Sequence, residues 1–577
     1  MRYTGARILI EVLVEQGVDT VFGYPGAAVL HIYDELYRQR GRIRHILTSH
    51  EQHAAHAADG YARSTGKTGV CIATSGPGAT NLITGIAAAF MDSSPLVAIT
   101  GNVATSLLGK DSFQEVDIAG ISMPVVKHNW IVKDPGELAE TVREAFAVAG
   151  SGRKGPVLID IPRDVAATEA EWTAGACPLY AGAGSPPSGA EDRARRLAGR
   201  SGRRTFTGED IERAAGMLSG AKRPVLYAGG GVISSAAHNE LAALAERLDA
   251  PVAVSLMGMG AVPSDHRLCT GLVGMHGTAA SNKAVQKADL LAAIGVRFSD
   301  RVTSRTDLFA KNARILHIDI DPAEVNKNVH ADASVIGDVR EVLSRLLEII
   351  PPGGRGASAW NGEIERWKAI VPKDYHRQAA LHPRRVILET ARRLGDGAIV
   401  TADVGQHQMW TAQFYPFSRP RSFLTSGGLG AMGFGLGAAA GAKIANPGRP
   451  VVLFTGDGCF RMNSAEMATL VSFGIPVLIV LFNNGVLGMV RQWQEFFYGG
   501  RYSETDLPAE PDFVKLAAAY GVKAYRAVCE KSLGEALDSA FAELPDGKPV
   551  LVEAVIDRDE RVFPMVPGGT PIDEQIM

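Results

Sequence analysis

Short apolar runs alternate with helical patterns through three regions of the chain, and no other feature narrows the possible folds as far. The runs are apolar throughout, which is typical of strands that are buried on both faces of a parallel sheet. Strands and helices in alternation predict parallel α/β layers. We expect buried strands at 69–74, 96–100, 156–160, 225–228, 252–255, 290–294, 315–319, 398–401, 451–455 and 476–482.

Two stretches without periodicity divide these regions. The stretch 173–202 is rich in Gly, Pro, Ser and Ala and is typical of a linker, and 351–356 marks a second break. A chain of 577 residues is also too long for a single core, since cores stop growing beyond about 250–300 residues. We therefore predict an α/β fold with three parallel-sheet domains, at 1–170, 205–350 and 380–577.

Composition excludes several classes of protein. The net charge of -3 offers no basic field for nucleic acid, and the basic stretch 193–204 is interpreted as part of the solvated linker. The five cysteines are odd in number and lack CxxC spacing, which argues against a disulfide framework and a structural zinc site. The first residues run into an amphipathic pattern, so we expect no signal peptide, and the longest apolar run, 476–482, is far shorter than the ~20 residues of a membrane span. We expect a soluble, cytoplasmic protein.

The most specific motif is Gly456-Asp457-Gly458, which follows a predicted buried strand. A helix, expected at 464–473, and a second buried strand lead from it to Asn484 and Gly485. The glycines allow the backbone to approach phosphate oxygens, and Asp457, Asn484 and the carbonyl of Val486 are oxygen ligands of the kind that Mg²⁺ prefers. Each half alone is a common strand-end turn. Together, at this spacing and after two buried strands, they match the thiamine diphosphate signature, which implies a diphosphate bridged by Mg²⁺.

Two further segments are expected near this diphosphate. Gly405, Gln406, His407 and Gln408 follow the predicted strand around 399–404, and they place backbone and imidazole groups at the same edge of the sheet. The glycine-rich segment 427–435 is expected to turn into a helix beside a closely approaching cofactor. It does not match a dinucleotide fingerprint, because no buried strand is expected to precede it.

Glu51 is the candidate for the carboxyl group that thiamine diphosphate requires at its pyrimidine ring. It lies where a strand turns into a helix expected at 54–63. A local explanation also fits: Ser49 caps this helix, Gln52 closes a capping box, and an acidic residue is favourable at the positive helix end. Glu51 and Asp457 lie in different layers, and in enzymes of this kind the two usually come from different subunits. A dimer is therefore the expected minimum functional unit.

With these motifs in place, the chain closely resembles the catalytic large subunits of acetolactate synthases, also called acetohydroxyacid synthases. The resemblance covers nearly the whole length apart from the linker, and it is carried by 74–81, 112–115, 274–277, 426–430 and 488–494. It implies a pyrimidine-binding, a middle and a diphosphate-binding domain. The implied reaction decarboxylates pyruvate on thiamine diphosphate and joins the two-carbon unit to a second 2-keto acid, pyruvate or 2-ketobutyrate. The products are 2-acetolactate or 2-aceto-2-hydroxybutyrate, in the first common step of branched-chain amino acid synthesis.

The resemblance also implies roles for individual residues. Glu51 becomes the activating acid and Gly26 a loop residue near the reacting carbon, while Met432 holds the cofactor bent. Three residues of the first domain enter the active site: Phe113, Gln114 and Lys127. The family binds FAD in its middle domain without redox turnover, and the matching positions are Arg153, Gly229, Gly230, Gly231, Gly274, Met275, His276, Gly277, Asp319 and Asp338. A glycine turn after a strand is, however, about equally often a plain strand–loop connection that binds no dinucleotide.

Arg297 and Trp493 are the positions that the resemblance assigns to the second substrate. An arginine suits a carboxylate because its guanidinium binds both oxygens, and the tryptophan favours 2-ketobutyrate. A surface salt bridge and a packing tryptophan are the alternative interpretations. The resemblance further implies a homodimer or homotetramer and a possible separate regulatory small subunit.

Some positions depart from the usual pattern of the family. His53 and Gly437 stand where a small residue and a proline are usual, and Asn102 and Ala104 stand where Gln and Pro are usual. None removes a group that the chemistry needs. Three rivals stay open: a pyruvate oxidase, which passes electrons to its flavin; another carboligase or acetyltransferase of the superfamily; and a flavoprotein scaffold without catalysis.

Overall fold

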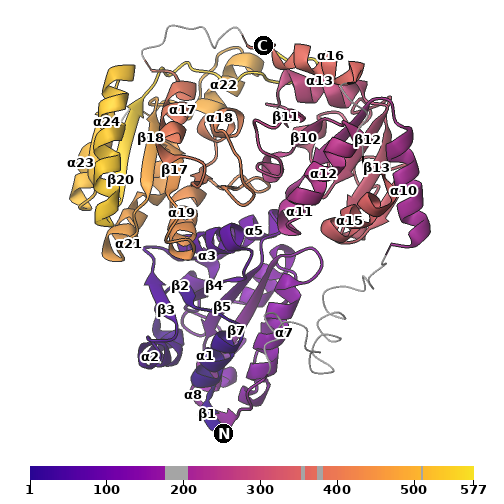
Figure 1. Cartoon of the computed structure of the whole chain (residues 1–577). Coiled ribbons are helices and arrows are strands. Elements are labelled where there is room, and N and C mark those ends of the chain that lie inside the picture. The colour runs from indigo at the N-terminus through magenta and orange to yellow at the C-terminus, as the bar shows by residue number, and fades with distance from the viewer. Residues whose placement is uncertain (176–205, 353–357, 373–380, 508–510) are drawn as a thin grey trace.

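The computed structural model describes residues 1–175, 206–352, 358–372, 381–507 and 511–577. Most of the predicted linker and of the second break lies outside the described residues. Three six-stranded sheets form the molecule, each with parallel neighbours throughout and helices on both faces. In Figure 1 the first domain lies below, and the other two lie side by side above it. The predicted fold class is confirmed. Among the described residues no helix has the length and apolar character to cross a membrane.

The first sheet has the order β3-β2-β4-β5-β7-β6. Its strands are β2 (Thr20–Tyr24), β3 (Arg44–Leu47), β4 (Gly69–Ala73), β5 (Leu96–Asn102), β6 (Asn129–Ile131) and β7 (Pro156–Pro162). One face is covered by α1 (Gly5–Glu15), α2 (Leu30–Arg38) and α7 (Leu138–Gly150), and the other by α3 (Glu51–Thr65) and α5 (Ile83–Met91). Short elements complete this domain: β1 (Arg2–Thr4), α4 (Pro77–Asn81), α6 (Ile118–Ser122), α8 (Arg163–Ala167) and β8 (Glu169–Glu171).

The second sheet has the order β11-β10-β9-β12-β13-β14. Its strands are β9 (Pro224–Ala228), β10 (Val252–Val254), β11 (Cys269–Leu272), β12 (Leu290–Ile294), β13 (Arg314–Asp319) and β14 (Ala333–Ile336). Its helices are α10 (Gly208–Gly220), α11 (Gly230–Ser234), α12 (His238–Leu248), α13 (Ala279–Lys287), α14 (Asp300–Thr303), α15 (Val339–Ile349) and α16 (Ala359–Lys368). The first of these helices begins after Thr207, because Thr207 and Asp210 form a reciprocal capping box.

The third sheet has the order β16-β15-β17-β18-β20-β19. Its strands are β15 (Ile399–Ala402), β16 (Phe423–Thr425), β17 (Val451–Gly456), β18 (Leu478–Asn483), β19 (Lys523–Ala527) and β20 (Val550–Val555). Its helices are α17 (Pro383–Leu394), α18 (Gln406–Phe414), α19 (Phe434–Ala445), α20 (Asp457–Asn463), α21 (Met467–Ser472), α22 (Gly488–Phe497), α23 (Phe513–Ala519) and α24 (Glu530–Glu543).

Two local features of this third domain were not predicted. The expected helix at 464–473 is present as a 3-10 turn, η8 (Ser464–Glu466), followed by α21, but it is preceded by α20, which the sequence pattern did not predict. The break falls at Asn463, which leaves the helical region and donates its side-chain amide to the carbonyl of Gly433, 3.2 Å away. The glycine-rich segment 427–435 is in fact preceded by a strand, β16, whose three residues are too few for a sequence pattern to reveal.

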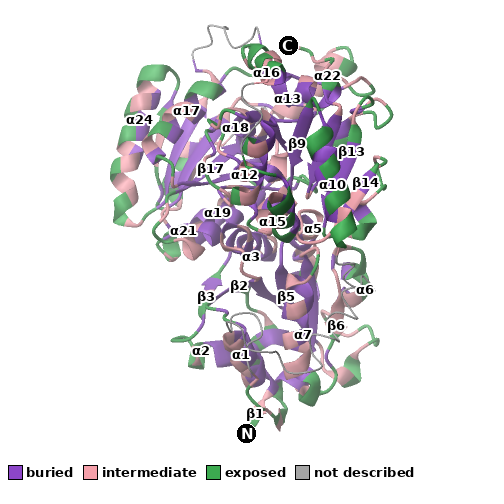
Figure 2. Cartoon of the chain, turned by 45° about the vertical axis from the view of Figure 1, so that its right-hand side comes forward, coloured by how far each residue is buried: buried purple, intermediate pink, exposed green. Residues whose placement is uncertain are grey.

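The first and third domains meet where α3 crosses α19 (Figure 1), a contact buried along α3 (Figure 2). The helix axes approach closely because glycines face backbone: a Cβ at Gly60 would collide with the carbonyl of Ala438, and one at Gly441 with that of Ala57. Since α3 begins at Glu51, this crossing fixes the glutamate against the third domain. The C-terminal tail links the third domain to the second, where Ile572 joins the core.

Candidate active site

The two halves of the predicted metal site lie together in the structure. The Gly456-Asp457-Gly458 motif is at the carboxyl end of β17, and the turn at Asn484 is at the carboxyl end of β18. Asp457 is 3% exposed, and its Oδ2 accepts hydrogen bonds from the backbone N–H groups of Asn484 (3.1 Å) and Gly485 (2.8 Å). Its other oxygen accepts from Gly458 N at 2.7 Å. The carboxylate therefore holds the second turn in place while it faces the strand ends, where open α/β sheets bind ligands.

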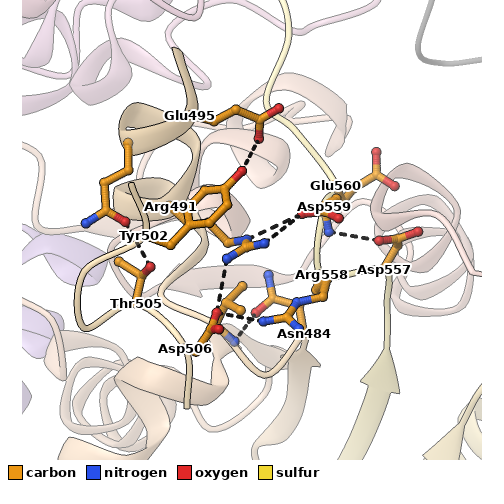
Figure 3. A network of polar contacts seen from close by, with 12 residues as sticks. Asn484, Arg491, Glu495, Tyr502, Thr505, Asp506, Asp557, Arg558, Asp559 and Glu560 are labelled. Atoms are coloured by element: carbon orange, nitrogen blue, oxygen red, sulfur yellow. Dashed lines mark hydrogen bonds and ion pairs between the residues drawn. The ribbon is translucent and has the colours of Figure 1, made fainter. Parts of the chain in front are cut away.

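The turn after Asn484 is braced by a second segment of the third domain. Val486 forms an antiparallel bridge with Asp506, and its N–H donates to Asn484 Oδ1 at 3.2 Å. Figure 3 shows how Arg491 ties this brace to the C-terminal tail: its guanidinium donates to Asp506 at 3.0 Å and to Asp559 at 3.3 Å. The Val486 carbonyl thus belongs to a backbone segment that is held from two sides.

Gly405, Gln406, His407 and Gln408 form the turn from β15 into α18. Gly405 has a φ of 149°, which favours glycine. Gln406 donates to the carbonyl of Glu560 at 2.8 Å, and Gln408 donates to Thr425 Oγ1 at 2.7 Å, so both are used in protein contacts. His407 differs, because its Nε2 is buried without a hydrogen-bond partner among the described residues, and burial lowers its pKa to about 3.

Small residues leave room between these groups. A Cβ at Gly456 would lie 2.9 Å from His407 Nδ1. A Cβ at Gly458 would lie 2.6 Å from Leu487 Cδ2 and 3.7 Å from Met432 Cε. Met432 therefore lies beside the Gly456-Asp457-Gly458 turn, and any larger residue in place of either glycine would fill the space between the turn and its neighbours.

On the side of the first domain, residues gather around the segment that leads from β4 into α4. Glu51 is 9% exposed, and its Oε2 accepts from Asn81 Nδ2 at 3.0 Å. A Cβ at Gly78 would lie 3.2 Å from Glu51 Oε1, and one at Gly26 would lie 2.5 Å from the Thr74 side chain. Gly26 and Glu51 therefore flank the same turn. Sequence reasoning had not singled out Asn81, although it closes the 74–81 motif.

The cap of α3 is not the predicted one. His50, rather than Ser49, is the N-cap, and its Nδ1 accepts from Gln52 N at 3.1 Å. Ser49 instead donates its hydroxyl to the carbonyl of Ala465 at 2.9 Å. The reason is tertiary: the third domain supplies an acceptor that draws Ser49 away from the helix it precedes in sequence.

The other expected active-site residues of the first domain lie in two places. Phe113 is 88% exposed, and Gln114, with a φ of 59°, contacts Gly76 through its backbone. Lys127 lies elsewhere: its Nζ donates to the carbonyl of Ser151 at 2.7 Å and to that of Val148. Burial, and then the nearby Arg153, lower the pKa of Lys127 to about 8.

Arg153 joins the first domain to the end of β13, where several expected flavin positions lie. It pairs with Glu324 at 2.8 Å and with Asp321 at 3.5 Å. Asp319 is 8% exposed, and burial raises its pKa to about 7. Asp338 has a different task, because its side chain caps α15 by accepting from Arg340 N at 2.9 Å.

The expected glycine positions of the second domain lie at neighbouring strand ends. Gly229 follows β9, where a Cβ would collide with the carbonyl of Gly295 after β12, and one at Gly231 would lie 2.6 Å from Gly295 Cα. Gly230 lines a cavity between the domains together with Lys154 and Arg421. The remaining positions form a turn after β11, held by the C-terminal tail; they are Gly274, Met275, His276 and Gly277.

Arg297 follows β12 in the second domain, whereas Trp493 lies in α22 of the third. Arg297 lies near Arg153 and the acidic cluster at the end of β13, and burial, then Arg153, lower its pKa. Arg301, which sequence reasoning had not considered, places its guanidinium carbon 5.8 Å from the centre of the Trp493 ring. In sequence it stands four residues after Arg297, in the short helix α14 that follows the loop of Arg297.

Comparison with known proteins identifies the family of this arrangement. The N-terminal TPP binding domain, the central domain and the C-terminal TPP binding domain of thiamine pyrophosphate enzymes match residues 3–121, 211–346 and 403–554. An acetolactate synthase large subunit from Mycobacterium tuberculosis is 46% identical over 581 residues, which cover 99% of this chain and 91% of the relative. The chain belongs to the acetolactate synthase family of thiamine pyrophosphate enzymes. The resemblance inferred from the motifs is confirmed.

Two further organisms supply family members of similar likeness. A probable acetolactate synthase large subunit from Methanocaldococcus jannaschii is 47% identical over 573 residues, covering 98% of this chain and 94% of the relative. The isozyme 3 large subunit from Escherichia coli is 44% identical over 579 residues, covering 99% and 98%. In this family frame, Glu51 lies within the matched N-terminal TPP binding domain, and Asp457 and Asn484 lie within the C-terminal one.

Proposed function

We propose that this chain is the catalytic subunit of an acetolactate synthase, which decarboxylates pyruvate and joins the two-carbon unit to a second 2-keto acid. The observation that carries the proposal is the Asp457 carboxylate, which holds the Asn484–Gly485 turn at the strand ends of the third sheet. An amide oxygen, a carboxylate and a fixed backbone carbonyl at one sheet edge suit a divalent cation that bridges a diphosphate.

The residues of this edge fit thiamine diphosphate and Mg²⁺. Asp457, Asn484 and the Val486 carbonyl would hold the metal. His407, whose Nε2 is buried without a partner in the described part of the chain, would face the diphosphate. When bound, thiamine diphosphate supplies the electron sink for decarboxylation and for carbon–carbon bond formation. The glycines at 456 and 458 would let its phosphates approach the backbone.

Glu51 would serve the other end of the cofactor. Its carboxyl group is buried, is oriented by Asn81, and would exchange a proton with the pyrimidine ring through Oε1, the oxygen beside Gly78. We propose that the pyrimidine end and the diphosphate end of each site come from two subunits, so that a homodimer, or a homotetramer built from it, is the functional unit. Several relatives are named as large subunits, and we propose a separate regulatory small subunit here too. We propose the cytoplasm as its compartment.

The second domain fits FAD. Gly229–Gly231 at a strand end and the cationic Lys154 and Arg421 around the adjoining cavity are suited to a dinucleotide diphosphate. The buried Nδ1 of His317 and Oε2 of Glu324 have no partner among the described residues, and they lie next to the Asp319 position. We propose that these residues hold the flavin and that it plays no redox part in turnover.

Binding of the acceptor substrate provides a prediction that distinguishes the roles of Arg301 and Arg297. Arg301 lies beside Trp493, and Arg301→Gln is therefore expected to raise the KM for 2-ketobutyrate about 10- to 100-fold. This is the effect of losing a charge-assisted hydrogen bond between the guanidinium and the substrate carboxylate. Arg297→Gln, close to Arg153 and Asp319, is expected to weaken FAD binding instead. The measurement is the ratio of 2-aceto-2-hydroxybutyrate to acetolactate at varied 2-ketobutyrate, with FAD retention measured by absorbance.

The reverse pattern would support Arg297 as the residue that binds the carboxylate of the second substrate, as the sequence resemblance implies. Arg305→Gln is the matched control, because Arg305 is exposed and pairs only with Asp307 among the described residues. It is expected to leave both the product ratio and the flavin content unchanged.

The proposed activity as a whole is tested with purified protein, pyruvate, Mg²⁺, thiamine diphosphate and FAD, with acetolactate measured colorimetrically. We expect acetolactate that depends on added thiamine diphosphate and Mg²⁺, and a flavin spectrum that stays oxidised during turnover. Absence of acetolactate would exclude the proposed reaction. Bleaching of the flavin during steady turnover would favour a pyruvate oxidase.

A further inference from the structure

The turn that carries Glu51 is held by a carboxylate of the third domain. Glu466 lies in η8 and is 2% exposed. Its Oε1 accepts from the backbone N–H groups of Ser49 at 2.8 Å and His50 at 3.1 Å, the two residues that immediately precede Glu51. The same oxygen lies 3.0 Å from Nδ1 of His53, which is 5% exposed.

The other contacts of this turn lead to the same short stretch of the third domain. Glu466 Oε2 accepts from Thr469 Oγ1 at 2.8 Å, and that hydroxyl also lies 3.2 Å from the carbonyl of Leu47, at the end of β3. Ser49 donates to the carbonyl of Ala465 at 2.9 Å. Both ends of the segment between β3 and α3 are therefore fixed by residues 465–469.

These contacts are of a strong kind. Hydrogen bonds to an ionised carboxylate are roughly twice as strong as neutral ones, and a buried carboxylate without partners is unfavourable. The Ser49 and His50 N–H groups precede the first turn of α3, where a negative charge is also favourable. Loss of Glu466 would leave these donors unpaired next to Glu51.

We propose that Glu466 is a positioning residue for Glu51, through which the third domain fixes the turn that presents the activating carboxyl group. The inference rests on the proposed function, because it requires Glu51 to act on the cofactor. His53 strengthens the contact, since its Nδ1–H donates to the same oxygen, and this gives a role to a residue that departs from the family pattern.

The contrary explanation is that Glu466 only holds two domains together. A purely structural carboxylate would affect thermal stability and leave the chemistry of a correctly folded site unchanged. A positioning residue would slow the step that Glu51 promotes, because misplacement by about 1 Å can lower a rate about 100-fold. The experiment must therefore measure that step separately from stability and from turnover.

The first measurement is the exchange of the C2 hydrogen of bound thiamine diphosphate for deuterium, followed by acid quench and proton NMR in the absence of pyruvate. Glu466→Ala is expected to slow this exchange about 10- to 100-fold. Glu466→Gln, which folds more safely because its amide keeps one acceptor oxygen, is expected to fall between it and the wild type. Rates within about twofold of the wild type in both variants would overturn the proposal.

Glu51→Gln, measured in parallel, separates this inference from the proposed function. Unchanged exchange in Glu51→Gln would mean that Glu51 does not activate the cofactor, and the proposed function would fail with it. Slow exchange in Glu51→Gln together with wild-type exchange in both Glu466 variants would overturn only the role of Glu466.

The second measurement uses the cofactor-free protein. Amide hydrogen exchange of the peptide that spans 47–52 is expected to be about 10-fold faster in Glu466→Ala, because two of its N–H groups lose their acceptor. Unchanged protection of this peptide would also overturn the proposal. Asp249→Asn is the matched control: Asp249 is 3% exposed and accepts from Ser358 N at 3.1 Å in the second domain, away from this turn. It is expected to change neither measurement.

Discussion

Replacement of Glu51 by glutamine is expected to lower acetolactate formation about 100- to 10,000-fold, the range that a positioned general acid–base group contributes. Glutamine has nearly the shape of glutamate and keeps an oxygen for the Asn81 amide, 3.0 Å from Glu51 Oε2. It cannot take up or release a proton at Oε1, beside Gly78. The rate of acetolactate formation at saturating pyruvate measures the effect, and thermal unfolding confirms that the variant is folded.

The binding of thiamine diphosphate separates a chemical role of Glu51 from a structural one. Glu51→Gln is expected to bind the cofactor with nearly wild-type affinity, because the residues proposed to hold the diphosphate and Mg²⁺ are unchanged in it. Glu35→Gln is a suitable control, since Glu35 is also a buried glutamate of the first domain, 5% exposed, and accepts from Gln39 at 2.9 Å. Nearly full activity of Glu51→Gln would contradict the mechanism proposed here.

The layer architecture could be predicted from the sequence because strands that are buried on both faces consist of short, continuous apolar runs. The expected strand at 290–294 coincides with β12, and those at 69–74 and 451–455 differ from β4 and β17 by one residue. The edge strand β16 escaped because three residues carry no periodicity. The helix α20, which begins at Asp457, was not predicted. It is separated from η8 at Asn463, whose side-chain amide donates to the carbonyl of Gly433 in a distant segment.

The candidate site likewise has contacts that the sequence predicts and contacts that it does not. The Asp457–Asn484 pairing was predictable because consecutive parallel strands must end at one edge of the sheet. The contact between Arg301 and Trp493 joins the second and third domains, and no local sequence pattern predicts it. The cap of α3 failed for the same reason, because Ser49 is bound by a carbonyl of the third domain rather than by its own helix. Contacts between residues of different domains could therefore not be predicted from local sequence patterns.

Substitution of Asp457 is expected to have the second large effect. In Asp457→Ala the affinity for Mg²⁺ should fall by more than the about 10- to 100-fold that loss of a supporting hydrogen bond to a ligand produces. The carboxylate both carries the charge at the strand ends and holds the turn through Asn484 N and Gly485 N. Titration of Mg²⁺ at fixed thiamine diphosphate, followed by calorimetry and by activity, measures the loss.

Asp457→Asn separates these two tasks, because an amide oxygen can still accept from the turn but carries no charge. If charge on the metal ligand decides affinity, the Asn variant binds Mg²⁺ nearly as weakly as the Ala variant while its turn stays ordered. If Asn binds Mg²⁺ like the wild type, Asp457 only braces the turn and the metal lies elsewhere. Asp160→Asn is the control for a buried carboxylate, since Asp160 lies in β7 of the first domain and accepts from Thr100 Oγ1 at 2.7 Å, so its replacement should leave Mg²⁺ affinity unchanged.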